Sequence, residues 1–294
     1  MGYFFILFAV LCNTVKGYAS KRVSGDLQTV RESISFNIAR NAICCIFAFL
    51  FVLIENVKGL FNITPQETII CTVSGIAMAV FTCAWILALK TDAYMLVSAC
   101  ASASFSVPCI FGLAFLGEVF TVCKFAAFIM ILCALYFLLR YNFSLKGKLG
   151  KRQILLLGLI LISQGITQTM QKLYNVYIPD KETACYTLYM FVVSFAVLLP
   201  ILPFYKKEKT NGECSVIKNN TVYIIIMGLS LFASSYFQTI AAKSIDTIVM
   251  YPLLNVLNLI GGSIMASLLF KEKMTRDSII GIILVFCALI FSKF

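Results

Sequence analysis

Long apolar runs follow one another along this chain, and each is about as long as a membrane span. An α-helix needs about 20 predominantly apolar residues to cross the hydrocarbon core of a bilayer, where its backbone must satisfy its own hydrogen bonds. Ten such runs are present: 2–20, 33–55, 67–89, 93–116, 119–139, 152–173, 184–204, 220–241, 246–270 and 276–292. The longest polar gaps, 140–151 and 205–219, are too short for a soluble domain. The sequence therefore predicts an all-α integral membrane protein with ten transmembrane helices.

The composition supports the same fold class. The 294 residues are 61% hydrophobic and 13% charged, whereas soluble domains carry about 25% charged residues. This excludes a cytosolic enzyme, a DNA-binding domain and a disordered tail. The net charge of +11 lies mostly in short loops, where cations set membrane topology and face anionic lipid. We therefore expect membrane lipids, and not nucleic acid, as the partners of this charge.

The two halves of the chain match each other at fixed offsets. The matches are Asp92 with Asp246, Glu118 with Glu272 and Cys133-Ala134-Leu135 with Cys287-Ala288-Leu289 at an offset of 154, and Asn13 with Gln164 and Lys21 with Lys172 at 151. We interpret residues 1–145 and 146–294 as two copies of a five-span repeat. Because each copy has an odd number of spans, the second is inverted in the membrane. Inverted repeats are typical of secondary transporters, whose substrate site lies near the midplane between the repeats.

Short motifs after the spans extend this interpretation. Leu116-Gly117-Glu118 follows span four, Phe270 to Lys273 (FKEK) follows span nine, and Arg40 lies early in span two. With these motifs in a five-plus-five arrangement, the chain resembles the EamA-like branch of the drug/metabolite transporter superfamily over essentially its whole length. The resemblance implies the transporter fold and leaves the substrate open. Pro108 departs from the repeat, because its register mate is Gly262, so we expect the helix breaks around the cavity to differ between the halves.

The cations also predict an orientation. Sixteen of the 24 Lys and Arg residues lie in the loops after spans one, three, five, seven and nine, and six lie on the other side. The positive-inside rule places the cation-rich side in the cytoplasm and both termini outside. Several members of the family that the chain resembles have cytoplasmic termini instead, and we follow the charge count. The expected location is the plasma membrane.

Two cations lie within spans, where ionisable groups are costly and mark functional sites. At 1.5 Å per residue, Lys16 and Arg40 lie roughly 7 and 12 Å from the same membrane face, and no carboxylate lies in the interior of a span, away from its ends, to pair with them. One interpretation is a positive cavity that binds a carboxylate or a phosphate. The alternative is that Lys16 extends to the interface and that Arg40 caps carbonyls. The carboxylates at span ends, Asp92, Asp246, Glu118 and Glu272, are expected at helix N-termini or in loops.

Polar side chains recur at helical spacing in both repeats. Because polar groups within a bilayer must face protein or water, we expect these stripes to line a central cavity; hydrogen bonding between helices is the alternative. The predicted substrate-binding residues are Asn13, Lys16, Arg40, Trp85, Ser98, Ser102, Gln164, Thr167, Gln168, Gln238, Tyr251, Asn255 and Asn258.

The residue inventory argues against catalysis. There is no His, which removes the commonest general base and metal ligand, and the 12 Cys residues form no CxxC pair. We expect no enzyme activity, no metal and no cofactor. The predicted function is alternating-access transport of a small polar metabolite with a carboxylate or phosphate, such as an amino acid, organic acid or sugar phosphate. The alternatives are multidrug efflux and an accessory or lipid-flippase subunit, which would have a lipid-open groove. The oligomeric state stays open, and a monomer is compatible with the sequence.

Overall fold

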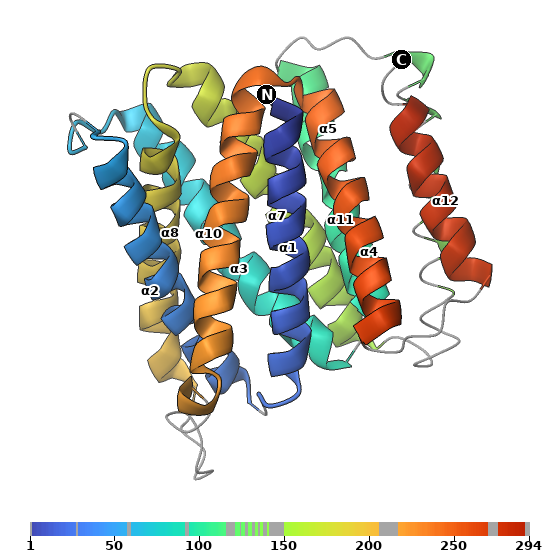
Figure 1. Cartoon of the computed structure of the whole chain (residues 1–294), viewed down its shortest axis with the longest axis horizontal. Helices are drawn as coiled ribbons and strands as arrows, with labels where there is room; N and C mark the ends of the chain where they lie inside the picture. The colour runs from blue at the N-terminus through green and yellow to red at the C-terminus, as the bar shows by residue number, and fades with distance from the viewer. Residues whose placement is uncertain are drawn as a thin grey trace.

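The structure is a computed structural model and describes residues 2–27, 29–57, 60–91, 94–115, 150–205, 217–269 and 276–291, with scattered residues between 121 and 140. Within these ranges every secondary-structure element is helical, and eight helical segments are long and apolar enough to cross a membrane. Figure 1 shows a bundle of steep helices in which α1 begins and α12 ends at the same end. The protein is therefore an α-helical, multi-span membrane protein.

The elements follow the predicted spans closely. In chain order they are α1 (Gly2–Ser24), α2 (Val30–Ile54), α3 (Pro65–Thr91), α4 (Tyr94–Ser102), η1 (Ala103–Phe105), α5 (Ser106–Phe115), α7 (Lys151–Tyr177), α8 (Thr183–Ile201), η2 (Leu202–Phe204), α10 (Thr221–Ser244), α11 (Thr247–Leu269) and α12 (Arg276–Phe291). Nine of the ten predicted spans thus have helices at their positions. The predicted span 119–139 lies largely outside the described residues.

The outer surface of the bundle is apolar. Phe4 and Leu11 on α1 are each 61% exposed, and Leu53 on α2 is 60% exposed. Side chains of this kind would form a large unfavourable patch in water. In a bilayer, lipid chains cover them, and the polar groups turn inward.

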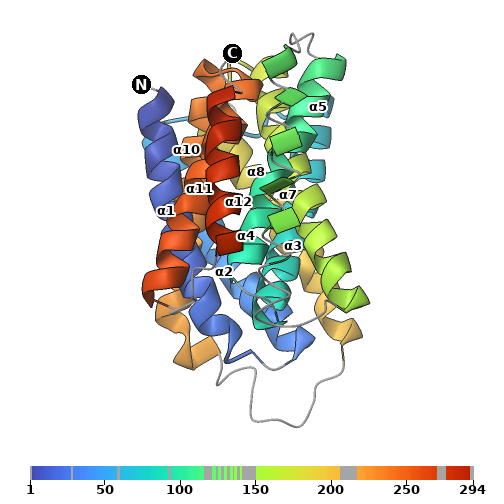
Figure 2. The same ribbon diagram turned by 90° about the vertical axis from the view of Figure 1, so that its right-hand side faces the viewer.

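The packing of the helices repeats itself with the two halves exchanged. α1 packs on α10 and α3 packs on α7; α2 packs on α10 and α8 packs on α3; α1 packs on α11 and α7 packs on α4. Figures 1 and 2 show the resulting interlocked arrangement, with α1 beside α11 in both views. The core therefore lies between the halves of the chain and not within either half alone.

Two glycines make equivalent close approaches in the two halves. A methyl group at Gly75 on α3 would come within 2.5 Å of Val193 Cβ on α8. A methyl group at Gly228 on α10 would come within 2.6 Å of a side-chain carbon of Ile43 on α2. Small residues let membrane helices pack backbone to backbone, and both approaches depend on glycine.

Two lysines bond equivalent carbonyls at opposite ends of the bundle. Lys21 Nζ on α1 donates to the carbonyl oxygen of Leu89, near the C-terminus of α3, at 2.9 Å. Lys172 Nζ on α7 donates to the carbonyl oxygen of Ala242, near the C-terminus of α10, at 3.4 Å. Lysine is favourable at these positions because the last carbonyls of a helix lack intrahelical partners and carry partial negative charge.

The helix breaks differ between the halves, as the position of Pro108 predicted. The fourth span changes from α4 through the 3-10 turn η1 to α5, whereas α11 continues unbroken from Thr247 to Leu269. Proline removes one backbone hydrogen bond and clashes with the carbonyl four residues earlier, which is that of Ser104, within η1. A methyl group at Gly165 on α7 would lie 2.9 Å from this Ser104 carbonyl oxygen, so the glycine lets α7 approach the break.

One of the four span-end carboxylates can be placed. Asp246 directly precedes α11, and its carbonyl oxygen accepts hydrogen bonds from the N–H groups of Val249 and Met250 at 3.1 and 2.9 Å. It therefore stands at a helix N-terminus, as expected. Asp92, Glu118 and Glu272 lie outside the described residues.

Candidate functional site

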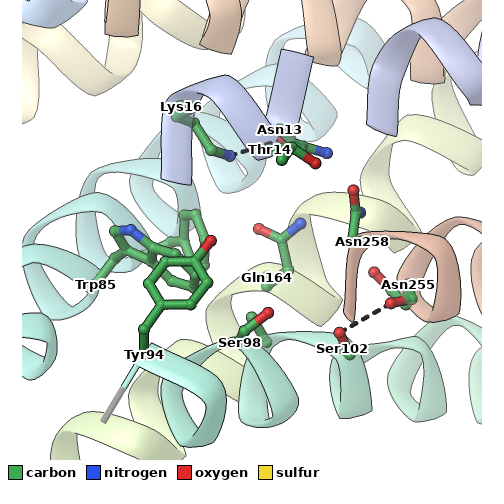
Figure 3. Close-up of a pocket in the computed structure, with 12 residues that line it drawn as sticks. Asn13, Thr14, Lys16, Trp85, Tyr94, Ser98, Ser102, Gln164, Asn255 and Asn258 are labelled. Carbon is green, nitrogen blue, oxygen red and sulfur yellow. Dashed lines mark hydrogen bonds between the residues drawn. The ribbon is translucent and has the colours of Figure 1, made fainter. Parts of the chain in front are cut away.

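A polar cavity lies between helices of both halves of the chain. It has a volume of about 50 Å³ and is enclosed by α1, α3, α4, α7 and α11. Its lining residues, most of them labelled in Figure 3, are Asn13, Thr14, Lys16, Phe81, Trp85, Tyr94, Ser98, Ala101, Ser102, Gln164, Asn255 and Asn258. Within the part of the chain that the structure describes, this lining contains one cation, Lys16, and no acidic residue.

A hydrogen-bonded chain holds the Lys16 ammonium at one wall. Lys16 Nζ donates to Asn13 Oδ1 at 2.9 Å, one turn earlier on α1. The same oxygen accepts a bond from Ser234 Oγ on α10 at 2.8 Å, and Gln238 Nε2 donates to Ser234 Oγ at 2.7 Å. Gln238 does not line the cavity. It supports the group that orients the ammonium.

Aromatic rings form the wall beside the ammonium. The Lys16 ammonium lies 5.7 Å from the centre of the Phe81 ring, within the range of a cation–π interaction. The Phe81 ring centre is 5.7 Å from that of Trp85, and the Trp85 ring meets Tyr94 edge-on at 6.1 Å. Figure 3 shows the Tyr94 hydroxyl directed into the space between the walls. This wall combines an apolar surface with one hydroxyl group.

Amides and hydroxyls form the opposite side. The Gln164 side chain extends into the space from α7, with its amide facing Lys16 and Tyr94 across the cavity (Figure 3). Ser102 Oγ donates to the backbone oxygen of Asn255 at 2.9 Å, which joins α4 to α11. Asn258 Oδ1 is buried without a hydrogen-bond partner. A buried polar atom of this kind costs free energy until something donates to it, so the cavity retains an unused acceptor.

Some predicted lining residues lie one layer behind the cavity. Gln168 is fully buried, and its side-chain amide pairs with that of Asn255 through bonds of 3.2 and 3.5 Å. The Tyr251 hydroxyl donates to the Gln168 backbone oxygen at 2.6 Å. Thr167 Oγ1 donates to the carbonyl of Ser163, on its own helix, at 3.0 Å. The bonds of Gln168 with Asn255 and Tyr251 connect α7 and α11, so these side chains use their polar atoms on each other.

Arg40 also lies outside the lining and is the largest fully buried side chain that the structure describes. It is 2% exposed, and its Nε and Nη2 atoms have no hydrogen-bond partner. It is close enough to Lys16 for the two positive charges to repel each other. A buried unpaired charge is strongly unfavourable. Because the guanidinium lies close to Lys16, its charge adds to the positive potential at the wall that carries Lys16.

The structure brings together eight of the thirteen predicted residues. The eight that line the cavity are Asn13, Lys16, Trp85, Ser98, Ser102, Gln164, Asn255 and Asn258. Arg40, Thr167, Gln168, Gln238 and Tyr251 do not line it. Thr14, Phe81, Tyr94 and Ala101 also line it, and they lie outside the thirteen predicted residues. A threonine bonded to its own helix, a phenylalanine and an alanine carry no sequence signal that separates them from packing residues.

The fold and the cavity together define a class of protein: a multi-span membrane protein whose two halves enclose a small polar chamber. Residues 151–294 match the model of the EamA-like transporter family, which is part of the drug/metabolite transporter superfamily. The resemblance drawn from the sequence is thereby confirmed for the second half of the chain. The members of this family are membrane transporters of small molecules, so the match points to a transporter and away from an enzyme.

Solved structures support the fold independently. Among 28 matching chains, one titled only "Crystal structure of protein" aligns with a TM-score of 0.70 at 12% identity, covering 99% of this chain and 95% of the other. At this identity the likeness establishes the fold alone. A search of curated protein sequences finds no match.

Proposed function

We propose that this protein is a secondary transporter of a small polar metabolite that carries a carboxylate or a phosphate, working by alternating access in the cell membrane. The observation that supports the proposal is the charge of the cavity. The Lys16 ammonium faces the cavity, and Arg40 lies behind the wall that carries Lys16, with Nε and Nη2 atoms that lack partners. The described lining has no acidic residue. An anion would supply the missing counter-charge, because charge-assisted hydrogen bonds in a water-poor site are the strong ones.

The mechanism that we propose uses the two repeats, 1–145 and 146–294, as inverted units. The exchanged helix pairings, the paired approaches at Gly75 and Gly228, and the paired bonds of Lys21 and Lys172 all support this arrangement. Each observation in one half has a counterpart in the other at an offset of 150 to 154 residues. Two such units can rock about a shared central site and open it to either side in turn.

The size of the cavity supports a conformational cycle. Its volume of about 50 Å³ holds a few water molecules, whereas ligand pockets usually measure about 300–1,000 Å³. The helices that enclose it must therefore move apart before a metabolite can enter. This conformation corresponds to a contracted stage of the cycle that we propose.

The test is ligand-dependent thermal stability of the purified protein in detergent. A ligand that binds only the folded state raises stability by RT ln(1 + [L]/Kd), so weak substrates register at high concentration. We expect shifts with members of a panel of carboxylates and phosphates. Lys16→Gln removes a charge-assisted bond of about 1.5–3 kcal/mol, which should weaken binding by about 10- to 100-fold.

Lys218→Gln serves as the matched control, because Lys218 is an exposed cation outside the cavity. It should leave the ligand shift unchanged. Equal shifts in the wild-type protein and Lys16→Gln would overturn the anion site while leaving the transporter class intact.

Multidrug efflux is the second candidate, and the aromatic wall favours it. Phe81, Trp85 and Tyr94 present adjoining rings, and such rings bind planar or cationic drugs. Shifts with lipophilic cations alone, together with loss of drug resistance when the protein is deleted, would put efflux first. Against it stands the Lys16 ammonium, which repels a cation at the same wall.

A further inference from the structure

A second cavity, separate from the polar one, opens on the lipid-facing side of the bundle. It has a volume of about 240 Å³ and lies where α2, α3, α7 and α8 meet. Its lining residues are Val30, Ser33, Ile34, Ala79, Val80, Cys83, Ala84, Leu87, Leu156, Leu159, Val197, Leu198, Ile201 and Tyr205. We call this space the apolar groove. It shares no residue with the lining of the polar cavity.

The groove suits a hydrocarbon chain, because most of its lining is aliphatic and Ser33 and Cys83 already have hydrogen-bond partners. Ser33 Oγ donates to the Thr29 carbonyl at 3.1 Å. Cys83 Sγ accepts a bond from Asn37 Nδ2 at 3.5 Å. From Ala79 to Leu87 the groove follows α3 for about 12 Å at 1.5 Å per residue, which is a substantial part of one leaflet of a bilayer.

Cations surround the end of the groove that faces the membrane surface. Arg31 adjoins Val30, Lys90 is one turn beyond Leu87 on α3, and Arg152 is one turn before Leu156 on α7. Arg31 Nη1 donates to the carbonyl oxygens of Leu202 and Tyr205, which anchors it beside the groove.

One carboxylate offsets part of this charge. Glu32 attracts Lys90, and Arg152 repels it. Glu32 is also the N3 residue of the capping box of α2, where its carboxylate accepts a bond from the backbone N–H of the N-cap residue Thr29. Arg31, Lys90 and Arg152 outnumber Glu32, so these four described groups together carry a positive charge.

We propose that the apolar groove and its rim bind an anionic phospholipid, with one acyl chain in the groove and the phosphate at Arg31, Lys90 and Arg152. The rim lies on the cation-rich side of the chain, which the sequence predicts to face the cytoplasm, where leaflets carry anionic lipid. In this proposal the site differs from ordinary lipid contact because the cations of its rim select an anionic headgroup. Lipid flipping would need a polar path for the headgroup, and the groove lining is apolar.

The test uses the full-length protein reconstituted in vesicles of equal parts phosphatidylglycerol and phosphatidylcholine. The protein is re-extracted in detergent, and the lipid that it retains is identified by mass spectrometry. We expect phosphatidylglycerol to be enriched several-fold over the vesicle mixture, because each basic residue near a membrane surface contributes about fivefold to the binding of anionic lipid. The double variant Lys90→Gln, Arg152→Gln should return the retained lipid toward the composition of the mixture.

A matched pair of variants tests the groove itself. Val80 and Val73 are both 37% exposed on α3, and only Val80 lines the groove. Val80→Trp should fill the groove and reduce the retained lipid, while Val73→Trp should not. Equal retention of the two lipids by the wild-type protein, or equal loss in both tryptophan variants, would overturn the proposal. If Val80→Trp fails to fold, the rim variant still decides.

Discussion

Arg40 is the residue at which a structural role and an anion-binding role predict opposite effects on stability. If it served packing, its removal would destabilise the fold. Its Nε and Nη2 atoms lack partners, and Lys16 repels it, so the unliganded fold gains little from the charge. We therefore expect Arg40→Met to leave the melting temperature unchanged, or to raise stability by about 1 kcal/mol, as for other buried charges replaced by apolar groups.

The same variant should weaken anion binding by about tenfold, because it removes part of the positive potential at the cavity. Melting curves with and without the anion identified by the panel give both quantities. Arg276→Met, at an exposed cation, is the control and should change neither. A large loss of stability in Arg40→Met would assign Arg40 a structural role instead.

Glu67 presents the opposite situation, a buried charge with partners. It is fully buried at the start of α3, 2.5 Å from Lys181 Nζ and 3.4 Å from the Tyr174 hydroxyl. Lys181→Met leaves this carboxylate without its counter-ion, and we expect a loss of about 1–3 kcal/mol, less than for a completely buried pair, because the lysine is 20% exposed.

Glu67→Gln in the Lys181→Met background should recover part of that loss, since an amide needs no counter-ion. Denaturant or thermal unfolding of the four proteins completes a double-mutant cycle. Additive effects of the two substitutions would show that the ion pair contributes nothing.

At the scale of helices, the close approaches at glycine make a prediction about packing. Gly75→Ala and Gly228→Ala each place a methyl group within 2.6 Å of a neighbouring side-chain carbon, so we expect destabilisation of about 1–3 kcal/mol. Gly158 on α7 has open space at the same position. Gly158→Ala should be neutral or slightly stabilising, because alanine favours the helix. Melting temperatures of the three variants decide, and similar losses in all three would point to helix propensity and not to packing.

The helices themselves could be predicted because lipid makes composition decisive: a span must be long, apolar and internally hydrogen-bonded. The break at η1 was likewise readable from Pro108. The rotation of each helix about its own axis, which decides which side chains face the cavity, was harder to predict from the sequence. Spacing identified Gln168 and Tyr251 as members of polar stripes, but it could not distinguish a side chain that faces the cavity from one that bonds to the next helix. Their mutual contact is set by how α7 and α11 pack.

At the scale of the whole molecule, the cavity is asymmetric although the packing repeats. Asn13 and its register mate Gln164 both line it, from α1 and α7. Trp85 on α3 lines it as well, while Gln238, its counterpart on α10, bonds to Ser234 behind the wall. The single cation and the aromatic wall thus both come from the first half. A repeat predicts equivalent positions, but the chemistry at each position diverges, so substrate recognition depends on residues that the repeat does not duplicate.

The orientation of the molecule follows from its loops and can be tested at two of them. Residues 206–216 follow the C-terminal end of α8 along the chain, and the turn at 178–182 lies at its other end. The first side carries sixteen cations in its loops and the second carries six. The positive-inside rule therefore predicts that Asp180 faces the outside and that residues 206–216 face the cytoplasm.

An epitope tag inserted beside Asp180 should bind antibody on intact cells, whereas a tag within 206–216 should bind it only after permeabilisation. The reverse pattern would keep the fold and overturn the orientation, and with it the cytoplasmic position proposed for the lipid rim. Labelling of both tags from one side would contradict the passage of α8 through the membrane.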